Sequence, residues 1–471
     1  MTVSRKPIAR RTVLAATMGT AAVATSALLA PTTATAAPTG TAGAAATPAA
    51  PGSAPCPADV SEALGRLAHP LRSTEPDAPT AGLRALGSMI GAARVVGLGE
   101  ATHGSHEFFT MKHRVFRYLV EEKGFTVFAL EASWSAGLLI DAFVQGRGDR
   151  DGNGDARQLV RRVMAGSPWQ REEFADLINW MRAYNRTRPQ RPVHFVGTDL
   201  GFPGIGDQPF SEVTDYLRKA APASLSGVEQ LYAGLRPFND ALGYLTRIPV
   251  PERQRNADQA QQALELVTAS GKAGDKDYEL AVQHARNIAR TFAFCAMRVD
   301  DTASAFAAQT LRDRAMADNT LWWQRRYGGK VLLSAHNAHV SLRSADPQQF
   351  PRPEGALLRE ALRGDYVAVG FTFGSGSFLT KADTFTDDWR STTVAPATLG
   401  MNEYLLDRVR PRDYYLDLRQ APPAARTWLD TARPTYDAGA TFRSDPLPTL
   451  ALGPAYDVLI HLHRVRAAGK L

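Results

Sequence analysis

Residues 95–104, VVGLGEATHG, contain the features on which we base the predicted fold. A short apolar run ends abruptly in Glu100 and His103, and three glycines in the same stretch allow tight backbone turns beside them. A buried strand that delivers a carboxylate and an imidazole to one place is a common way to build an active site. The alternative is a strand end with a solvated glutamate and a capping histidine.

Further short apolar runs resemble this one, and each is bounded by polar or helical segments. Such runs are expected of buried parallel strands in an α/β sheet. The predicted strands are residues 94–98, 126–130, 193–196, 331–334, 366–373, 413–418 and 456–460. Helical segments such as residues 106–122, 171–185 and 353–362 lie between them. The sequence therefore predicts an α/β fold.

An ionisable side chain follows each of the first four predicted strands. These side chains are Glu100, Glu131, Asp199 and His336. In open α/β sheets, ligands bind at the carboxyl ends of the strands. We therefore expect the four side chains to lie together and to form an active site.

Between the third and fourth predicted strands, several segments have helical apolar spacing and no convincing strand is found. We predict a helical insertion over residues 205–328, lying over the carboxyl edge of the sheet. The insertion is either a cap that shapes a substrate cleft or a lobe that extends the core. Residues 56–204 and 329–471 then form the two parts of the α/β core.

The first 37 residues have the pattern of an export signal. The pair Arg10 and Arg11 precedes an apolar, small-residue run and a small-x-small cleavage pattern, and it resembles a twin-arginine signal. This indicates export across a bacterial membrane and a secreted or extracytoplasmic protein without stable membrane association after signal removal; the alternative is an uncleaved membrane anchor. Residues 38–55, rich in Ala, Pro and Thr, are predicted to be a disordered linker.

The basic composition gives little reason to expect a nucleic-acid partner. The 471 residues carry a formal net charge of +7. Residues 1–37 hold four basic and no acidic side chains, so the charge falls to +3 without them. No basic run with interleaved aromatic residues is present, and we therefore expect no nucleic-acid binding.

His103 is the predicted general base, because an imidazole titrates near neutral pH. Glu100 or Glu131 supplies the carboxylate that fixes its tautomer, and the spacing does not distinguish between them. Lys112, in the helix that follows, either polarises a substrate carbonyl or is a surface charge. Because no Gly-x-Ser-x-Gly motif occurs in a strand-to-helix setting, activated water is the expected attacking group.

His336 and His339 are three residues apart, so one helical turn would place them on the same side. Together with the carboxylates they raise the alternative of a metal site, but the His-Glu-x-x-His spacing of zinc proteases is absent. We predict no catalytic metal and no cofactor. The two cysteines, Cys56 and Cys295, permit a disulfide in an oxidising compartment, and neither has the neighbours of a catalytic thiol.

Several motifs, in order, resemble the erythromycin esterase family over about residues 80–465. They are GLGEATHGSHEFFTMKHRVFRYLVEEKGF at residues 97–125, VFALEA at 127–132, VGTDL at 196–200, SAHNAHV at 334–340, DLR at 417–419 and YDVLI at 456–460. The resemblance implies a three-layer α/β/α core with a helical lobe and hydrolysis of a macrolide lactone without a required metal.

The resemblance also implies roles for individual residues. His103 matches the base, with Glu100 and Glu131 as its acidic partners, and His336 matches a second histidine that helps to bind or protonate. Lys112 stands where some members have arginine. His339 and Asp199 lie in matching segments and are expected, with Lys112, to contact the substrate.

The predicted function is therefore hydrolysis of a carboxylic ester or macrolactone by water that His103 activates. The expected partner is a small-molecule ester or lactone. The alternative is a non-enzymatic or metal-dependent protein that uses the same cleft to bind a small polar ligand.

Overall fold

The computed structural model describes residues 57–147, 154–201, 204–382 and 388–471. The predicted signal (1–37), the predicted linker (38–55) and Cys56 lie outside these residues. The predicted cleavage and the predicted bridge to Cys295 are therefore not addressed by the structure. Within the described residues, no helix is long and apolar enough to cross a membrane.

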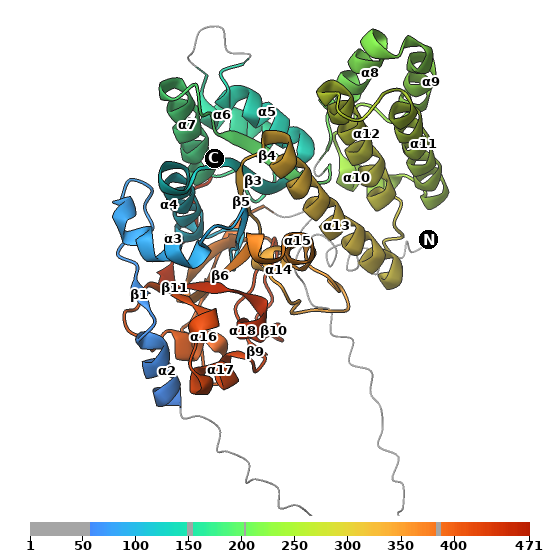
Figure 1. Cartoon of the computed structure of the whole chain (residues 1–471). Coiled ribbons are helices and arrows are strands. Elements are labelled where there is room, and N and C mark those ends of the chain that lie inside the picture. Colours follow the sequence, from blue (N-terminus) through green and yellow to red (C-terminus); the bar gives the residue numbers. More distant parts are fainter. Residues whose placement is uncertain (1–56, 148–153, 202–203, 383–387) are drawn as a thin grey trace, which may run out of the picture.

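A nine-stranded, mostly parallel sheet forms the centre of the protein (Figure 1). Its path runs β1-β8-β11-β6-β2-β5-β3-β4, and β7 pairs with β6. The pairs from β11 to β4 are parallel, whereas β1, β7 and β8 each pair antiparallel with their neighbours. The strands are β1 (His69–Pro70), β2 (Val95–Leu98), β3 (Phe125–Ser133), β4 (His194–Asp199), β5 (Lys330–Ser334), β6 (Tyr366–Thr380), β7 (Arg390–Val394), β8 (Tyr414–Asp417) and β11 (Val458–Val465). A separate two-stranded sheet contains β9 (Arg433–Pro434) and β10 (Thr449–Leu450).

All seven predicted strands are present, and the predicted α/β class is confirmed. The prediction for β6 ended too early, at residue 373, because the sequence GSGS that follows has the composition of a turn. In the structure Gly376 pairs with Val465 of β11 and with Val394 of β7. Strand β7 was not predicted, since most of its side chains are polar and exposed.

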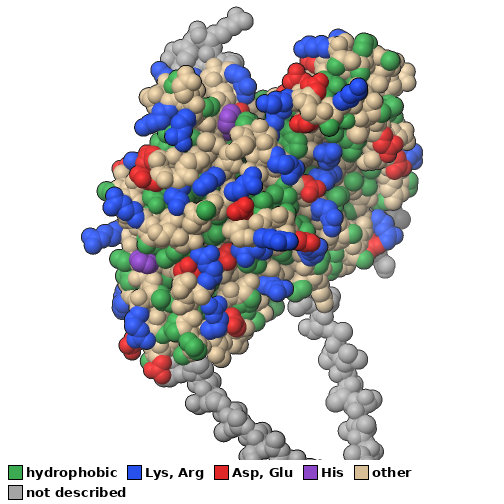
Figure 2. Space-filling model, in the orientation of Figure 1, with side chains coloured by type: hydrophobic (Ala, Val, Ile, Leu, Met, Phe, Trp, Pro, Cys, Tyr) green, Lys and Arg blue, Asp and Glu red, His purple; other side chains and the backbone are tan. Residues whose placement is uncertain are grey.

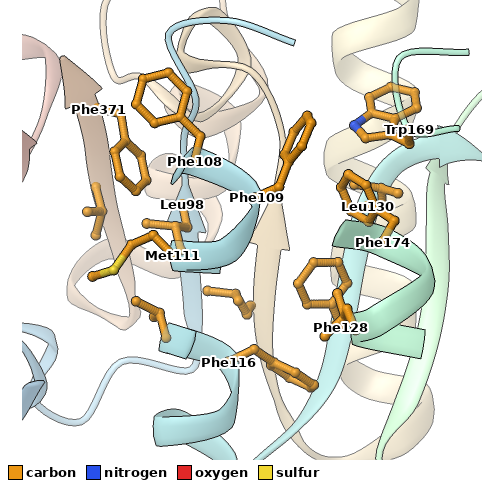
Figure 3. Close-up of a cluster of buried hydrophobic side chains, with 14 of the residues drawn as sticks. Leu98, Phe108, Phe109, Met111, Phe116, Phe128, Leu130, Trp169, Phe174 and Phe371 are labelled. Carbon is orange, nitrogen blue, oxygen red and sulfur yellow. The ribbon is translucent and has the colours of Figure 1, made fainter. Parts of the chain in front are cut away.

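Alternate residues of each strand face opposite sides of the sheet, which gives three layers. Val96 and Leu98 of β2 pack with helices α4 and α7 on one face, whereas Val95 packs on the other face with α2 and the C-terminal half of α13. Figure 3 shows the first of these clusters, in which Phe108 of α4 packs against Phe371 of β6, and Phe116 of α4 packs against Phe128 of β3. The three-layer α/β/α core is therefore present.

The helices of the core connect these strands and cover the sheet. Those before β5 are α2 (Pro57–Gly65), α3 (Arg84–Ile90), α4 (His106–Lys123), α5 (Trp134–Val144), α6 (Ala156–Val163) and α7 (Glu172–Thr187). Those after β5 are α14 (Asn337–Val340), α15 (Glu354–Leu362), α16 (Asn402–Leu406), α17 (Pro423–Leu429) and α18 (Leu452–Ala455).

Six helices lie between β4 and β5. They are α8 (Gln208–Ala220), α9 (Pro222–Tyr232), α10 (Ala241–Arg247), α11 (Val250–Ala269), α12 (Lys276–Cys295) and α13 (Thr302–Tyr327). Helices α8 to α12 enclose an apolar cluster of their own and stand beside the core at the upper right of Figure 1. Helix α13 belongs to both parts, since Ala315 packs in that cluster and Trp323 packs on the sheet. We retain residues 205–328 as the proposed insertion.

The surface is mixed in charge on the face shown in Figure 2. Lys and Arg side chains are spread over the core and over the helices of the insertion, with Asp and Glu side chains between them. The outline is hollowed between the upper part of the core and helices α8 and α9.

Candidate active site

The loop after β2 brings Glu100 and His103 together. Glu100 is fully buried and His103 is 6% exposed, and His103 Nδ1 lies 2.5 Å from Glu100 Oε1. Because a carboxylate only accepts hydrogen bonds, Nδ1 is the donor and the lone pair of a neutral imidazole is on Nε2. No hydrogen-bond partner of Nε2 is found within the described ranges. Glu100, rather than Glu131, is thus the carboxylate bound directly to His103.

The backbone of this loop is packed too closely for larger residues. A side-chain carbon added at Gly99 would come within 2.1 Å of Asn337 Oδ1, and one added at Gly104 would come within 2.1 Å of the Leu379 carbonyl oxygen. Gly104 also accepts hydrogen bonds from the backbone N–H groups of Leu379 and Ala468. The glycines therefore let strand β6 and the C-terminal residues hold the loop in place.

Lys112 lies on the buried face of α4 and contacts Glu100 of the His103–Glu100 pair. Its ammonium group donates to the second oxygen of Glu100 and, at 3.3 Å, to the Ala335 carbonyl oxygen, and its side chain is 1% exposed. Burial lowers the pKa of Lys112, and Glu100 offsets part of that effect. Burial by itself would raise the pKa of Glu100, but the Lys112 ammonium and His103 together lower it. Glu100 is therefore an ionised, fully bonded carboxylate.

Glu131, at the end of β3, is bound by three groups, one from α13 and two from α14 and its N-cap. Its Oε2 accepts from the His336 backbone N–H at 2.8 Å, and its Oε1 accepts from Arg312 Nη2 at 2.8 Å. His339 Nε2 lies 3.2 Å from the same Oε1. Burial would raise the pKa of Glu131, yet the charge and hydrogen bond of His339, with the charge of Arg312, hold it well below its usual value.

Arg312, from the middle of α13, binds both Glu131 and Asp199, the latter at the end of β4. Its Nε and Nη2 donate to the two oxygens of Asp199 at 2.6–3.0 Å, which is the forked geometry typical of arginine–carboxylate pairs. Burial would lower the pKa of Arg312, but Asp199 and Glu131 outweigh it and raise the pKa. One arginine from the insertion thus pairs with two carboxylates of the core.

The two histidines after β5 have different surroundings. His336 Nδ1 accepts from the Ala338 backbone N–H, and Nε2 lies 2.9 Å from Asp437 Oδ1, at ion-pair distance but without hydrogen-bond alignment. Burial lowers the pKa of His336, whereas Asp437 raises it, and the net direction is upward. His339 Nδ1 binds Asp313 Oδ1 at 2.7 Å, and the charges of Glu131 and Asp313 overcome burial and raise its pKa well above the usual value.

The seven predicted site residues therefore converge at one edge of the sheet. The rings of His103 and His336 are 4.8 Å apart, and the backbone N–H of His336 donates to Glu131. The residues around His103 are therefore continuous with those around Arg312. Trp169 packs edge-on against His103 at 5.6 Å. Among the described residues, no three His, Cys, Asp or Glu side chains are arranged to hold a metal ion. Cys295 is buried and unpaired within the described chain.

Four residues of the site were not predicted from the sequence: Arg312, Asp313, Asp437 and Trp169. Arg312 and Asp313 lie in a helix whose buried positions include Gln309, Asn319 and Gln324 among the apolar ones. Those buried polar positions are the signal that would have indicated them. Asp437 and Trp169 lie in loops, where the sequence offers no periodicity to interpret.

The fold and the site together define an α/β protein with a buried histidine–glutamate–lysine group at the carboxyl edge of a parallel sheet. The sequence model of the erythromycin esterase family matches residues 120–465. The chain belongs to the erythromycin esterase family, a family of esterases.

Individual relatives agree with this assignment. The erythromycin esterase type II of Escherichia coli is 26% identical over 324 residues, which cover 65% of this chain and 75% of that protein. A protein from Bacillus cereus of known structure is 28% identical with a TM-score of 0.79, covering 88% of this chain and 99% of its own. A solved succinoglycan biosynthesis protein is also 28% identical, with a TM-score of 0.76, covering 88% and 98%. A mutant of erythromycin esterase EreC in its open conformation shares the fold at 17% identity and a TM-score of 0.64, covering 84% and 96%.

Proposed function

We propose that the protein is a hydrolase that cleaves a carboxylic ester or macrolactone with water activated by His103. The observation that carries the proposal is the bond between His103 Nδ1 and Glu100 Oε1, which leaves the basic Nε2 without a partner in the described part of the chain. Glu100 fixes the tautomer and stabilises the imidazolium that forms during the reaction. This is the arrangement that a general base requires.

In the proposed reaction, Nε2 of His103 takes a proton from water while the water oxygen attacks the acyl carbon. The tetrahedral intermediate then expels the alkoxide, which receives the proton from His103. A carboxylic acid and an alcohol are released, and the enzyme returns to its starting state. We assign stabilisation of the oxyanion to the Nε2–H of His336, because Nδ1 accepts from the Ala338 N–H, Nε2 has no aligned acceptor in the described chain, and the ring lies 4.8 Å from that of His103.

We propose that Lys112, Asp199 and His339 hold other site residues in position and do not contact the substrate directly. The Lys112 ammonium is buried against Glu100, both oxygens of Asp199 are bound by Arg312, and both ring nitrogens of His339 face carboxylates. Groups engaged in this way hold the charges of Glu100 and Glu131 in place. The substrate then meets His103 and His336.

We propose that the body of the substrate extends from His103 toward a cavity of about 530 Å³ beside the end of β3, whose lining contains none of the seven site residues. The lining includes Ser133 and Ser135, which follow Glu131, and Gln208 and Asn239 of the insertion. This volume is within the range typical of small-molecule sites. Because the sequence also predicts an export signal, we propose an extracytoplasmic enzyme whose helical insertion contributes to substrate selection.

The test is His103→Gln, assayed on erythromycin and on a panel of simple esters and lactones by mass spectrometry for the gain of one water. We expect a loss of turnover of at least 100-fold, the lower end for removal of a general base. His113→Gln is the matched control, because His113 has similar burial at 5% exposed and lies in the adjacent helix. Retained turnover in folded His103→Gln protein, or no turnover of any substrate by the wild type, would overturn the proposal.

A further inference from the structure

A second cavity, of about 290 Å³, lies between α4 and α7. Helix α4 contributes His106, Thr110 and His113, and their spacing places all three on one face of the helix. The first turns of α7 contribute Glu172, Glu173 and Asp176. The remaining wall is formed by Glu75 and Pro76 and by C-terminal residues Arg466, Ala467 and Gly469. We call this space the acid-walled cavity.

Carboxylates outnumber cations in the acid-walled cavity. Four carboxylates line it, against one guanidinium and two imidazoles, and burial lowers the pKa of one of these, His113, to about 3. His106 is already engaged, with Nδ1 at 2.6 Å from Glu173 Oε1 and Nε2 at 3.2 Å from Glu75 Oε1. Arg466 lies 3.7 Å from Glu75 and 3.5 Å from Glu107. The α7 wall therefore presents negative charge that the cations of the cavity do not neutralise.

The raised pKa of Asp176 agrees with an excess of negative charge at the α7 wall of the cavity. Partial burial raises the pKa of Asp176, and the nearby carboxylates Glu172 and Glu173 raise it further. Arg157, which contacts it at 3.4 Å, offsets only part of this. A cation in the cavity would relieve this repulsion.

Two buried polar atoms of the lining have no hydrogen-bond partner among the described residues. They are His113 Nε2 and Glu173 Oε2, on side chains that are 5% and 7% exposed. His113 is neutral, because burial lowers its pKa to about 3. Buried polar groups are nearly always bonded, so these two unpartnered atoms on the α4 and α7 walls of one cavity are available to a ligand.

We propose that the acid-walled cavity is a second binding site, for a small organic ammonium ion that also carries hydroxyl groups. The ammonium group lies against Glu172, Glu173 and Asp176. The hydroxyl groups bond to the His113 imidazole and to the Thr110 oxygen, which can accept because its proton is donated to the Glu107 carbonyl oxygen. The volume suits a ligand of the size of a single amino sugar or amino polyol.

A bare metal ion suits the cavity less well. Its carboxylates are spread over the lining, and no three acidic or histidine side chains of the described chain are arranged as metal ligands. An ammonium ion on a carbon skeleton spans both walls, because it places charge at α7 and hydroxyl groups at α4. The site is independent of the reaction proposed for His103.

The test is isothermal titration calorimetry of the full chain with N-methylglucamine, a polyol ammonium ion, and with sorbitol as its uncharged counterpart. We expect one molecule of N-methylglucamine to bind per chain, more weakly as salt is added, and sorbitol not to bind. The His103→Gln protein should bind the amine as the wild type does. Equal binding of sorbitol, or no binding of the amine, would overturn the proposal.

Two variants locate the binding. Glu172 and Asp176 are exposed, so Glu172→Gln with Asp176→Asn should fold normally and weaken N-methylglucamine binding at least tenfold. Asp277→Asn with Glu279→Gln makes the same charge change in the first turn of α12 and should leave binding unchanged. The ¹⁵N resonance of His113 Nε2 should shift when the amine is added. Unchanged affinity in the first variant, or displacement of the amine by equimolar Ca²⁺, would contradict the proposed site.

Discussion

The two halves of the candidate active site are built in different ways. Glu100, His103 and Lys112 form the His103 side and come from a single loop and the helix that follows it. The Arg312 side joins residues of β3, β4, α13 and α14: Glu131, Asp199, Arg312, Asp313 and His339. His103 keeps one ring nitrogen without a partner in the described chain, whereas the ionisable groups of the Arg312 side are bonded to one another. The His103 side holds the group that we propose to react, and the Arg312 side balances charge.

Two glutamates near the Arg312 side show how strongly neighbouring cations affect the pKa of a buried carboxylate. Glu131 and Glu354 are both buried, yet the pKa of Glu131 is held well below its usual value and that of Glu354 is raised to about 8. Burial raises both, but Glu131 has Arg312 and His339 in contact, whereas Glu354 bonds only to the Thr320 hydroxyl through its side chain. One carboxylate is ionised and the other is protonated at neutral pH.

The largest effect on turnover, apart from loss of His103, is expected when Arg312 is replaced by methionine. Glu131 and Asp199 would then be buried without their shared cation, which costs about 3–5 kcal/mol when a buried pair is broken. We expect near-complete loss of activity and a lower midpoint in urea denaturation. Arg314→Met, an exposed change two residues away, should alter the unfolding free energy by less than about 0.5 kcal/mol. Normal stability of Arg312→Met would show that the Arg312 side does not depend on this cation.

Replacement of Lys112 by methionine is expected to have a smaller effect that depends on pH. The pKa of Glu100 is lowered in the folded protein, so its stabilising contribution is present above pH 4.5 and is lost as the pH falls through the folded value. Without the ammonium group this pKa rises. The acid limb of the activity profile should therefore move to higher pH, with a larger loss of kcat at pH 5 than at pH 8.

Two controls make the Lys112 experiment specific. Lys112→Arg keeps the positive charge and should restore most of the acid limb, and Lys123→Met, at the end of the same helix, should leave the profile unchanged. If Lys112→Met raises KM without moving the acid limb, the residue contacts substrate, as the sequence first indicated.

The smallest effect on turnover is expected for Glu354→Gln, which should change stability alone. The folded pKa of about 8 exceeds the unfolded value of 4.5, so the unfolded state loses its proton first and the wild type loses stability as pH rises between them. Relative to the wild type, the variant should gain up to about 4 kcal/mol between pH 5 and pH 8. Thermal melts at the two values measure this, and Glu360→Gln, exposed on the same helix, is the control. A constant difference would contradict the raised pKa.

The sheet was predictable from the sequence because each buried parallel strand is a separate apolar run. The ionisable residue after each of the first four runs indicated the site for the same reason, since parallel strands end at one edge. The extension of β6 and the polar strand β7 were not predictable. Their residues form strands only because β6 offers β7 a partner and β11 covers the glycines.

By itself, the sequence determined the α/β core, the loop that carries Glu100 and His103, and the seven residues that meet at one edge of the sheet. Local spacing and hydrophobic patterning are enough for these. Only the tertiary structure decided which glutamate binds His103, which charge neutralises Glu131 and Asp199, and which buried carboxylate stays protonated. Those outcomes depend on contacts between residues far apart in the sequence, such as Glu131 and Arg312, which are 181 positions apart, and on burial that no local pattern reports.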